Sequence, residues 1–310
     1  MSRAAAAELA PFLEGLFTRY HRPEFLGSDP LAMVRAFDAP ADRETAAVFA
    51  ALLAYGAVKQ INASLARLFA AMEPEGPAAF VAAFQPDAGA DATVPGPARL
   101  AGFRHRFTDG EDIAALCWLL RAAGPLELFF AACMDPAEPD LTGAMSRFVT
   151  NLTAVPAHPR FDIPRIVAKR SFKHLLPQAA RGSACKRLHM LLRWLARPDD
   201  GIDLGLWTTI HVAKLLVPVD THVLRIASNL GLLPPRATAD ARAARIITAA
   251  LRLADPHDPV RFDFALCRMG ILKACPAASR LTACDGCGLR APCRARRRLQ
   301  RAAARISLTA

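Results

Sequence analysis

Apolar residues recur three and four positions apart through most of this chain, as they do on the buried face of an amphipathic helix. The longest such stretch reads ETAAVFAALLAYGAVKQINASLARLFAAM and is interrupted at Gly56. Another, KRLHMLLRWLA, repeats leucine at helical spacing before Pro198 ends it. Short runs such as KLLVPV are the nearest approach to a strand, and no β-branched alternation indicates a sheet. The pattern therefore predicts an all-α fold.

Breaks in this pattern give the expected order of the helices. His21-Arg22-Pro23 ends a first helix, QPDAGADATVPGP forms a loop, and a proline-punctuated stretch follows at 155–164. The sequence contains no internal repeat and no long low-complexity linker. Beyond the two stretches above, helices are predicted over about 4–20, 112–123, 125–134, 139–151, 220–230, 238–253 and 258–273.

Composition agrees with a helical chain outside the membrane. Of the 310 residues 53% are hydrophobic and 7% aromatic, and abundant alanine and leucine favour helices over strands. Glu8 and Glu14 lie within the apolar N-terminal run, which argues against a signal peptide. No segment approaches the ~18 uninterrupted apolar residues of a membrane span. We therefore expect a soluble, cytoplasmic protein, whose eight cysteines belong to a metal, a cluster or the core rather than to disulfides.

The net charge of +11 is concentrated at the C-terminal end. Residues 275–310 hold eight arginines against Asp285 as the single acid, whereas the rest of the chain is nearly balanced. A compact basic end of this kind favours a polyanion partner, above all nucleic acid. The alternative is a solvated tail helix, because the whole chain uses 33 arginines and only six lysines.

Four cysteines fall in one short segment with the spacing C-x8-C-x2-C-x5-C: Cys275, Cys284, Cys287 and Cys293. Structural zinc prefers two tight pairs of cysteines, and only one pair is tight here. Uneven spacing within one segment is typical of a [4Fe–4S] cluster, in which each iron takes one thiolate. Zinc and unliganded cysteines are the alternatives. The remaining cysteines have apolar helical surroundings and are predicted core thiols: Cys117, Cys133, Cys185 and Cys267.

Asp220 stands immediately before a predicted helix, in PVDTHVLRIASNLGLL. Its carboxylate can cap that helix by accepting from the N–H of His222 or Val223. The helix has one apolar face, and its polar face carries His222, Arg225 and Asn229. A carboxylate at a helix N-terminus also stays ionised, because the helix dipole lowers its pKa. The residues alone leave open whether Asp220 is a cap or the acid of a chemical site.

VDTH followed by the four-cysteine segment resembles the helix-hairpin-helix DNA glycosylase superfamily, which includes endonuclease III. That superfamily carries its catalytic aspartate in VDTH and holds a [4Fe–4S] cluster with four cysteines, and its last two gaps match x2 and x5 here. The resemblance is clearest over 176–293. AYGAVKQI, GSACKRL, DDGIDLGLW and VDTHVLRIA look closer still to a bacterial branch known as a domain of unknown function. The hairpin departs from the usual LPGVGxKTA, because Leu176-Pro177 is followed by QAARGSACKR.

The resemblance implies a two-lobed glycosylase fold with a C-terminal cluster loop. One lobe would span 37–217, with a modified hairpin near 176–216, and the other would combine 1–36 with 218–310. The implied function is removal of a damaged base from double-stranded DNA by a nucleoid-associated monomer, with or without AP-lyase activity. Oxidised purine is the favoured substrate, because archaeal 8-oxoguanine glycosylases share the long lysine–aspartate spacing. The alternatives are a non-catalytic iron–sulfur or zinc DNA-binding protein of the same fold, and a zinc-stabilised RNA- or protein-binding module.

The resemblance also implies roles for single residues. Asp220 would stabilise a cation-like sugar, and Lys186, at the position of the superfamily's catalytic lysine, would attack the sugar to form a Schiff base. Lys214 or water is the alternative nucleophile. Tyr55, Lys59 and Gln60 would line the lesion pocket or fill the gap left by a flipped base, unless they are the solvent face of a core helix. Further DNA contacts are expected from Gly182, Ser183, Arg225, Arg296, Arg297 and Arg298.

Overall fold

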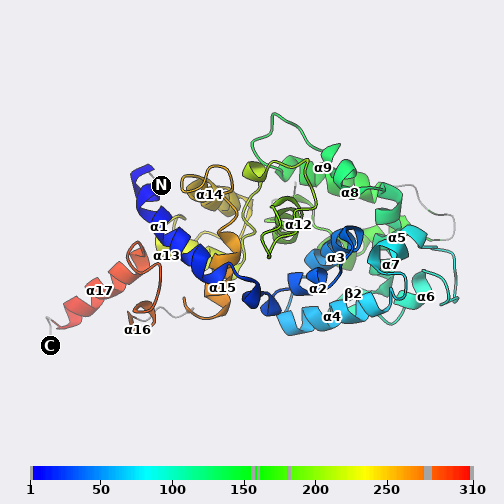
Figure 1. Cartoon of the computed structure of the whole chain (residues 1–310), viewed down its shortest axis with the longest axis horizontal. Helices are drawn as coiled ribbons and strands as arrows, with labels where there is room; N and C mark the ends of the chain where they lie inside the picture. Colours follow the sequence, from blue (N-terminus) through cyan, green and yellow to red (C-terminus); the bar gives the residue numbers. More distant parts are fainter. Residues whose placement is uncertain (1–2, 155–157, 159–160, 180–182, 276–280, 308–310) are drawn as a thin grey trace. The chain divides into compact units, whose positions relative to one another are not determined.

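The computed structural model describes residues 3–154, 158, 161–179, 183–275 and 281–307. Figure 1 shows a predominantly helical chain, so the predicted all-α class is confirmed. None of the described helices is long and apolar enough to cross a membrane. The elements are α1 (Arg3–Tyr20), η1 (Pro23–Ser28), α2 (Leu31–Arg35), α3 (Pro40–Leu52), α4 (Val58–Ala70), α5 (Pro77–Ala83), α6 (Pro97–Leu100), β1 (Arg104–His105), β2 (Thr108–Asp109), α7 (Gly110–Ala123), α8 (Leu126–Ala131), α9 (Thr142–Thr153), α10 (Ile163–Ala168), α11 (Arg170–Leu175), α12 (Lys186–Ala196), η3 (Val212–Lys214), α13 (Thr221–Leu230), α14 (Ala241–Arg252), α15 (Asp263–Ile271), α16 (Leu281–Cys284) and α17 (Arg294–Ser307).

The chain divides into two compact units that are not simple halves of the sequence. The first unit comprises Met1–Phe25, Ala184–His189 and His211–Ala310. The second comprises Leu26–Ser183 and Met190–Ile210. Helix α12 contributes its first residues to the first unit and the remainder to the second.

The second unit is built around α3 and α7. Every residue of α3 from Thr45 to Leu52 is buried, and α3 packs on α2, α4 and α5. α7 packs on α5, α6, α9 and α10, with a capping box between Asp109 and Asp112 at its start. A helix that is apolar on nearly all sides is expected at the centre of a core. The break predicted at Gly56 is confirmed, since α3 and α4 are separate helices and Gly56 has a φ of 103°.

A two-stranded hairpin is the one departure from helical structure among the elements described, apart from isolated bridge residues such as His158 and Phe161. β1 pairs antiparallel with β2, with His105 opposite Thr108. Strands of two residues are too short to show any alternation, so the sequence pattern could not predict them. Contacts from elsewhere in the unit support the hairpin: Lys169 Nζ lies 3.0 Å from a carboxylate oxygen of Asp109, and Tyr55 donates its hydroxyl to Thr108 Oγ1 at 2.6 Å.

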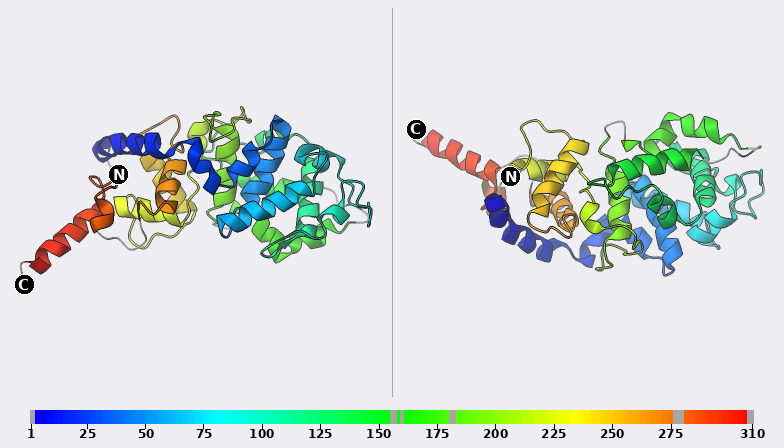
Figure 2. Two further views of the ribbon diagram at one scale, coloured as in Figure 1. Left: turned by 60° about the horizontal axis from the view of Figure 1, so that its bottom comes forward. Right: turned by 90° about the horizontal axis from the view of Figure 1, so that it is seen from above.

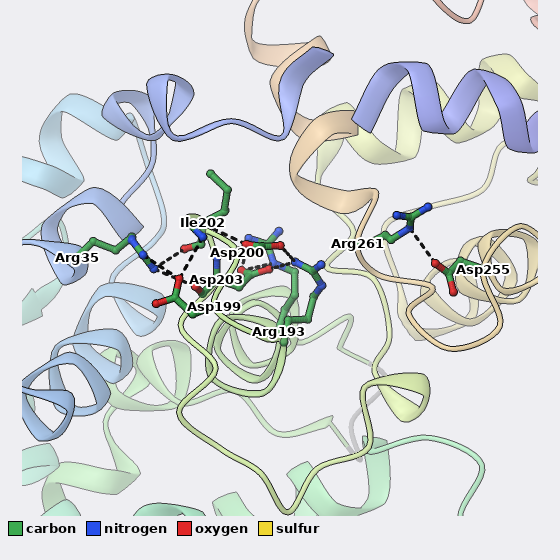
Figure 3. Close-up of polar contacts among 10 residues, drawn as sticks. Arg35, Arg193, Asp199, Asp200, Ile202, Asp203, Asp255 and Arg261 are labelled. Carbon is green, nitrogen blue, oxygen red and sulfur yellow. Dashed lines mark hydrogen bonds and ion pairs between the residues drawn. The ribbon is translucent and has the colours of Figure 1, made fainter. Parts of the chain in front are cut away.

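The stretch after α12 is held by a buried ion network in the second unit (Figure 3). Asp203 is completely buried, and its carboxylate pairs with Arg193 at 3.1 Å and with Arg197. Asp200 Oδ1 accepts from the N–H of Asp203 at 3.1 Å, which closes the turn. Arg35 donates to the Asp203 carbonyl at 2.9 Å and to Asp199 at 2.9 Å. The segment PDDGID is therefore an ordered turn rather than a loose insertion.

In the first unit, α15 packs against α1 and α13, and these are the orange, blue and yellow helices of Figure 2. Arg261, just before α15, helps to join these elements. Its guanidinium lies 2.8 Å from Asp255 (Figure 3), pairs with Glu14 of α1, and lies over the ring of Phe17 at 4.9 Å. Packing against α15 therefore fixes the position of α13, which has Asp220 at its start.

Candidate functional site

Asp220 caps α13, as the sequence predicts, but the cap occupies only one of its two oxygens. The residue has an extended backbone, and Oδ1 accepts from the N–H of His222 at 2.9 Å and of Val223 at 2.8 Å. Oδ2 has different neighbours: Lys186 Nζ lies 3.6 Å away and Cys267 Sγ lies 3.4 Å away. One carboxylate thus stabilises the helix and also presents a second oxygen to an amine and a thiol.

Lys186 reaches Asp220 because α12 begins at this residue and its start belongs to the first unit. The preceding residue, Cys185, is buried and has a positive φ of 41°, which turns the chain sharply into the helix. The Lys186 side chain keeps 36% of its surface exposed, whereas that of Asp220 keeps 13%. The pair is therefore sheltered on the carboxylate side and open to solvent on the amine side. Lys214, the alternative lysine, lies in η3.

The electrostatics around Asp220 keep the carboxylate ionised. Burial alone would raise its pKa, but the positive charge of Lys186, the N–H of Val223 and the thiol of Cys267 outweigh burial, so the pKa is lowered. For Cys267 the balance is opposite, since burial and the negative charge of Asp220 both raise the thiol's pKa. At neutral pH the site therefore combines a carboxylate with a protonated thiol that donates to it.

Cys267 and Gly270 lie on α15 and complete the wall behind Asp220. The sequence predicts Cys267 as a core thiol, and the structure places this mostly covered thiol in contact with Asp220. At Gly270 a Cβ atom would come within 2.5 Å of the His222 side chain, so the glycine makes room for the imidazole. Cys267 and Gly270 are three residues apart and therefore lie on one face of α15. This spacing was the signal in the sequence that both could face the start of α13.

The cysteine segment meets α13 at its other end. Asn229 donates its side-chain amide to Cys275 Sγ at 3.5 Å, and its carbonyl accepts from Cys293 Sγ at 3.6 Å. Arg225, expected to contact DNA, donates its guanidinium to the Cys275 carbonyl at 2.6 Å. In the structure Arg225 therefore supports the cysteine segment.

The thiols of the four cysteines are suitable metal ligands, but in the described part of the chain they are not grouped closely enough to hold an ion. The pKa of Cys284 and of Cys287 is raised, first by burial and then by neighbouring thiols, including those of Cys275 and Cys293. Thiolates that oppose one another's ionisation are stabilised when they share a metal centre. Among the described residues no three potential ligands are arranged to hold an ion, and residues 276–280 lie outside that part of the chain.

Comparison with models of protein families finds a match over most of the chain. The family model described as "Protein of unknown function (DUF2400)" matches residues 29–272. The chain belongs to the DUF2400 family. The match includes Lys186, Asp220 and Cys267 and ends before Cys275, so the site at the start of α13 belongs to the family region and the cysteine segment lies beyond it. No curated protein and no solved structure matches this DUF2400 chain.

The second unit of the DUF2400 protein carries an aromatic cluster, of which the sequence predicted only Tyr55 as a functional residue. Tyr55 stacks on Phe107 with ring centroids 5.2 Å apart, and His174 lies edge-on to both rings at 4.8 Å and 4.6 Å. Phe107, at the tip of the hairpin, is 43% exposed. We call Tyr55, Phe107 and His174 the aromatic platform. The motif FRHRF, with aromatic and basic residues interleaved, was the available signal for Phe107.

The other predicted DNA contacts are divided among several places. Lys59 and Gln60 are exposed in the first turn of α4, near the aromatic platform residue Tyr55 in sequence. Ser183 is exposed, and Gly182 lies outside the described residues. The three α17 arginines that are predicted to contact DNA also have different surroundings. Arg297 and Arg298 line a cavity, whereas the backbone N–H of Arg296 lies 3.5 Å from Cys293 Sγ.

Proposed function

We propose that this DUF2400 protein is a DNA glycosylase that removes a damaged base, with Asp220 and Lys186 as its catalytic pair. The proposal rests on the different neighbours of the two carboxylate oxygens of Asp220: Oδ1 caps α13, while Oδ2 lies 3.6 Å from Lys186 Nζ. A carboxylate used only as a cap would not need a lysine and a protonated thiol on its second oxygen. The resemblance of VDTH and the four-cysteine segment to helix-hairpin-helix glycosylases supports the same reading.

The chemistry follows from the charges of this pair. As the C1′–N bond breaks, the base leaves with the bonding electrons and the sugar becomes cation-like, and the ionised Asp220 carboxylate stabilises that charge. Lys186 must lose a proton before its amine can bond to C1′, and the nearest oxygen able to accept the proton is Asp220 Oδ2. The C1′–O4′ bond then breaks and O4′ takes up the proton held by Asp220, which gives a Schiff base between C1′ and Lys186. Loss of a proton from C2′ then expels the 3′-phosphate by β-elimination and nicks the strand.

Two further groups would assist this reaction. Cys267, held protonated by burial, donates to Oδ2 and keeps the carboxylate oriented. Cys275, Cys284, Cys287 and Cys293 would hold a [4Fe–4S] cluster, with zinc as the alternative, which when bound supplies a cross-link between the end of α13 and the C-terminal segment. Oxidised purine in double-stranded DNA is the proposed substrate.

The decisive experiment incubates the protein with duplexes that carry a panel of lesions, with and without borohydride. We expect excision of one lesion class and a borohydride-trapped covalent complex. Lys186→Gln should abolish trapping, while Asp220→Asn, which keeps an oxygen to cap α13, should reduce excision by about 10² or more. Asp240→Asn is the matched control, because Asp240 caps α14 in the same way, through the N–H of Ala243.

Each outcome of this experiment assigns a role. Loss of trapping with slow excision retained would make Lys186 the lyase group and leave the glycosidic step to Asp220 and water. Tight binding of lesions with no excision of any of them would contradict the proposal and favour a non-catalytic DNA-binding protein, for which the aromatic platform is the supporting observation.

A further inference from the structure

A cavity of about 660 Å³ lies within the first unit, between the end of α13, the loop that follows it and α17. Ser228 and five arginines contribute to its wall: Arg236, Arg294, Arg297, Arg298 and Arg301. No carboxylate is among the described residues that line it. Its volume falls in the range of about 300–1,000 Å³ that is usual for ligand pockets.

The arginines are gathered there by the geometry of α17 and of the preceding loop. Four of them fall at helical spacing along RARRRLQRAAARIS and therefore occupy one face of α17. Arg236 comes from the loop after α13, where it adopts a positive φ of 60°. Gly231 ends α13 in the left-handed conformation, and a Cβ there would lie 2.2 Å from Arg294 Cδ. The glycine thus lets Arg294 lie directly against the end of α13.

The five arginines are exposed, so solvent and salt screen part of their mutual repulsion, and an anion among them would relieve the rest. Elsewhere in this protein arginines pair with acids, as Arg193 does with Asp203 and Arg147 with Glu138. Guanidinium groups bind phosphate through two parallel N–H donors, and their charge does not depend on pH in the physiological range. The wall of the cavity therefore matches a ligand that carries phosphate groups.

We propose that this cavity binds phosphodiester groups of a nucleic acid strand, as a second contact region besides Asp220 and Lys186. The identification of the strand as DNA rests on the proposed function. α13 has ten residues, so its two ends are about 15 Å apart, given a rise of about 1.5 Å per residue. That length corresponds to about four nucleotides at about 3.4 Å each. The cavity would thus hold the backbone several nucleotides away from the base being removed.

The proposal is tested by the salt dependence of duplex binding, measured by fluorescence anisotropy on the whole protein with an undamaged duplex. Arg298→Ala/Arg301→Ala removes two charges from the cavity. Arg242→Ala/Arg305→Ala removes two from the same unit at positions that do not line it. Each phosphate contact contributes about 0.9 to the slope of log K against log salt. We expect the cavity variant to lose about 1.8 in slope for every duplex sequence and the control pair to retain the full slope.

A second arm distinguishes the source of the phosphate. Inorganic phosphate and a mononucleotide are titrated into the same proteins by calorimetry, alongside a single-stranded and a duplex oligonucleotide. We expect the oligonucleotides to bind far more tightly than either small probe. Binding of inorganic phosphate as tight as that of the duplex, lost in the cavity variant, would assign the cavity to a free anion and overturn the proposal.

Other outcomes separate this inference from the proposed function. Equal loss of slope in the two variants would overturn the cavity as a site, because only the general charge of the unit would then matter, even if excision by the protein persisted. Selective loss of slope in the cavity variant, together with no excision of any lesion, would support the cavity and contradict the glycosylase. Circular dichroism of both variants checks that α17 still forms.

Discussion

The two oxygens of Asp220 have different neighbours, and this difference sets how the site should respond to pH. Oδ1 is occupied by backbone N–H groups, whereas Oδ2 faces Lys186 and Cys267. Burial would raise the pKa of this carboxyl, and the positive charge of Lys186 is the largest influence that lowers it. Removing Lys186 therefore changes the ionisation of Asp220 as well as removing a nucleophile.

We predict that the pH profile of single-turnover excision shifts in Lys186→Gln. In the unmodified protein the pKa of Asp220 is below its ordinary value near 3.8, so excision should not decline until the pH falls into that acidic range. Without the lysine the effect of burial is less opposed, the pKa rises, and the acidic limb should move to higher pH. An unchanged limb in the slow residual activity would show that Asp220 is not the group that titrates. Lys173→Gln, at an exposed lysine of α11 in the second unit, is the control with an equal loss of charge.

At the scale of elements, the turn after α12 is anchored by three acids, Asp199, Asp200 and Asp203, of which Asp203 alone is completely buried. Asp203 is completely buried between Arg193 and Arg197, which are themselves buried. A buried ion pair contributes little when intact, but removal of one partner leaves the other as an uncompensated charge. Without Asp203 both arginines would lose the buried carboxylate that they share, although Arg197 would keep its ion pair with Asp200 at 3.1 Å, so we expect the turn to be weakened.

We therefore predict that Asp203→Ala lowers the free energy of unfolding by about 3–5 kcal/mol, measured by urea denaturation. Asp199→Ala is the matched control, since Asp199 belongs to the same turn and pairs with Arg35, but its side chain is 46% exposed. An exposed pair of this kind contributes about 0–1 kcal/mol. Equal effects of the two substitutions would show that the turn is held by its backbone and not by the buried carboxylate.

The β1–β2 hairpin places Phe107 against the rings of Tyr55 and His174. This contact leads to a second prediction at the scale of elements. Stacking of a base on an exposed aromatic ring contributes about 1–3 kcal/mol to binding of single-stranded nucleic acid. Phe107→Ala should weaken binding of a single-stranded or lesion-bearing oligonucleotide by this amount, measured by anisotropy, without changing the melting temperature by more than a few degrees. Leu128→Ala removes another exposed apolar side chain of the second unit, 64% exposed, and should have no effect on binding.

At the scale of the whole molecule, three separate segments of the chain build the first unit. The cysteine segment closes it, because Cys275 and Cys293 both contact Asn229 near the end of α13. A metal centre held by these thiols would therefore join the C-terminal segment to the helix that Asp220 caps, and its loss should loosen the unit.

We predict that protein purified without oxygen is brown and contains about four irons per chain. Cys287→Ser should lose the iron and lower the melting temperature, whereas Cys133→Ser, in the turn after α8 of the second unit, should keep the iron content unchanged. Colourless protein with one equivalent of zinc, measured by elemental analysis, would replace the cluster by the zinc alternative. Protein with neither metal would contradict both.

The sequence by itself determined the helical class, the order of most helices and the cap at Asp220, because these depend on periodicity and on residues adjacent in the chain. It also pointed to Lys186 by resemblance. Only the tertiary structure placed Lys186 and Cys267 on one oxygen of Asp220, directed Arg225 to the Cys275 carbonyl, and brought Arg236 to the cavity that the α17 arginines line. These contacts join residues tens of positions apart, and packing between elements, which leaves no local periodic signal, decides them.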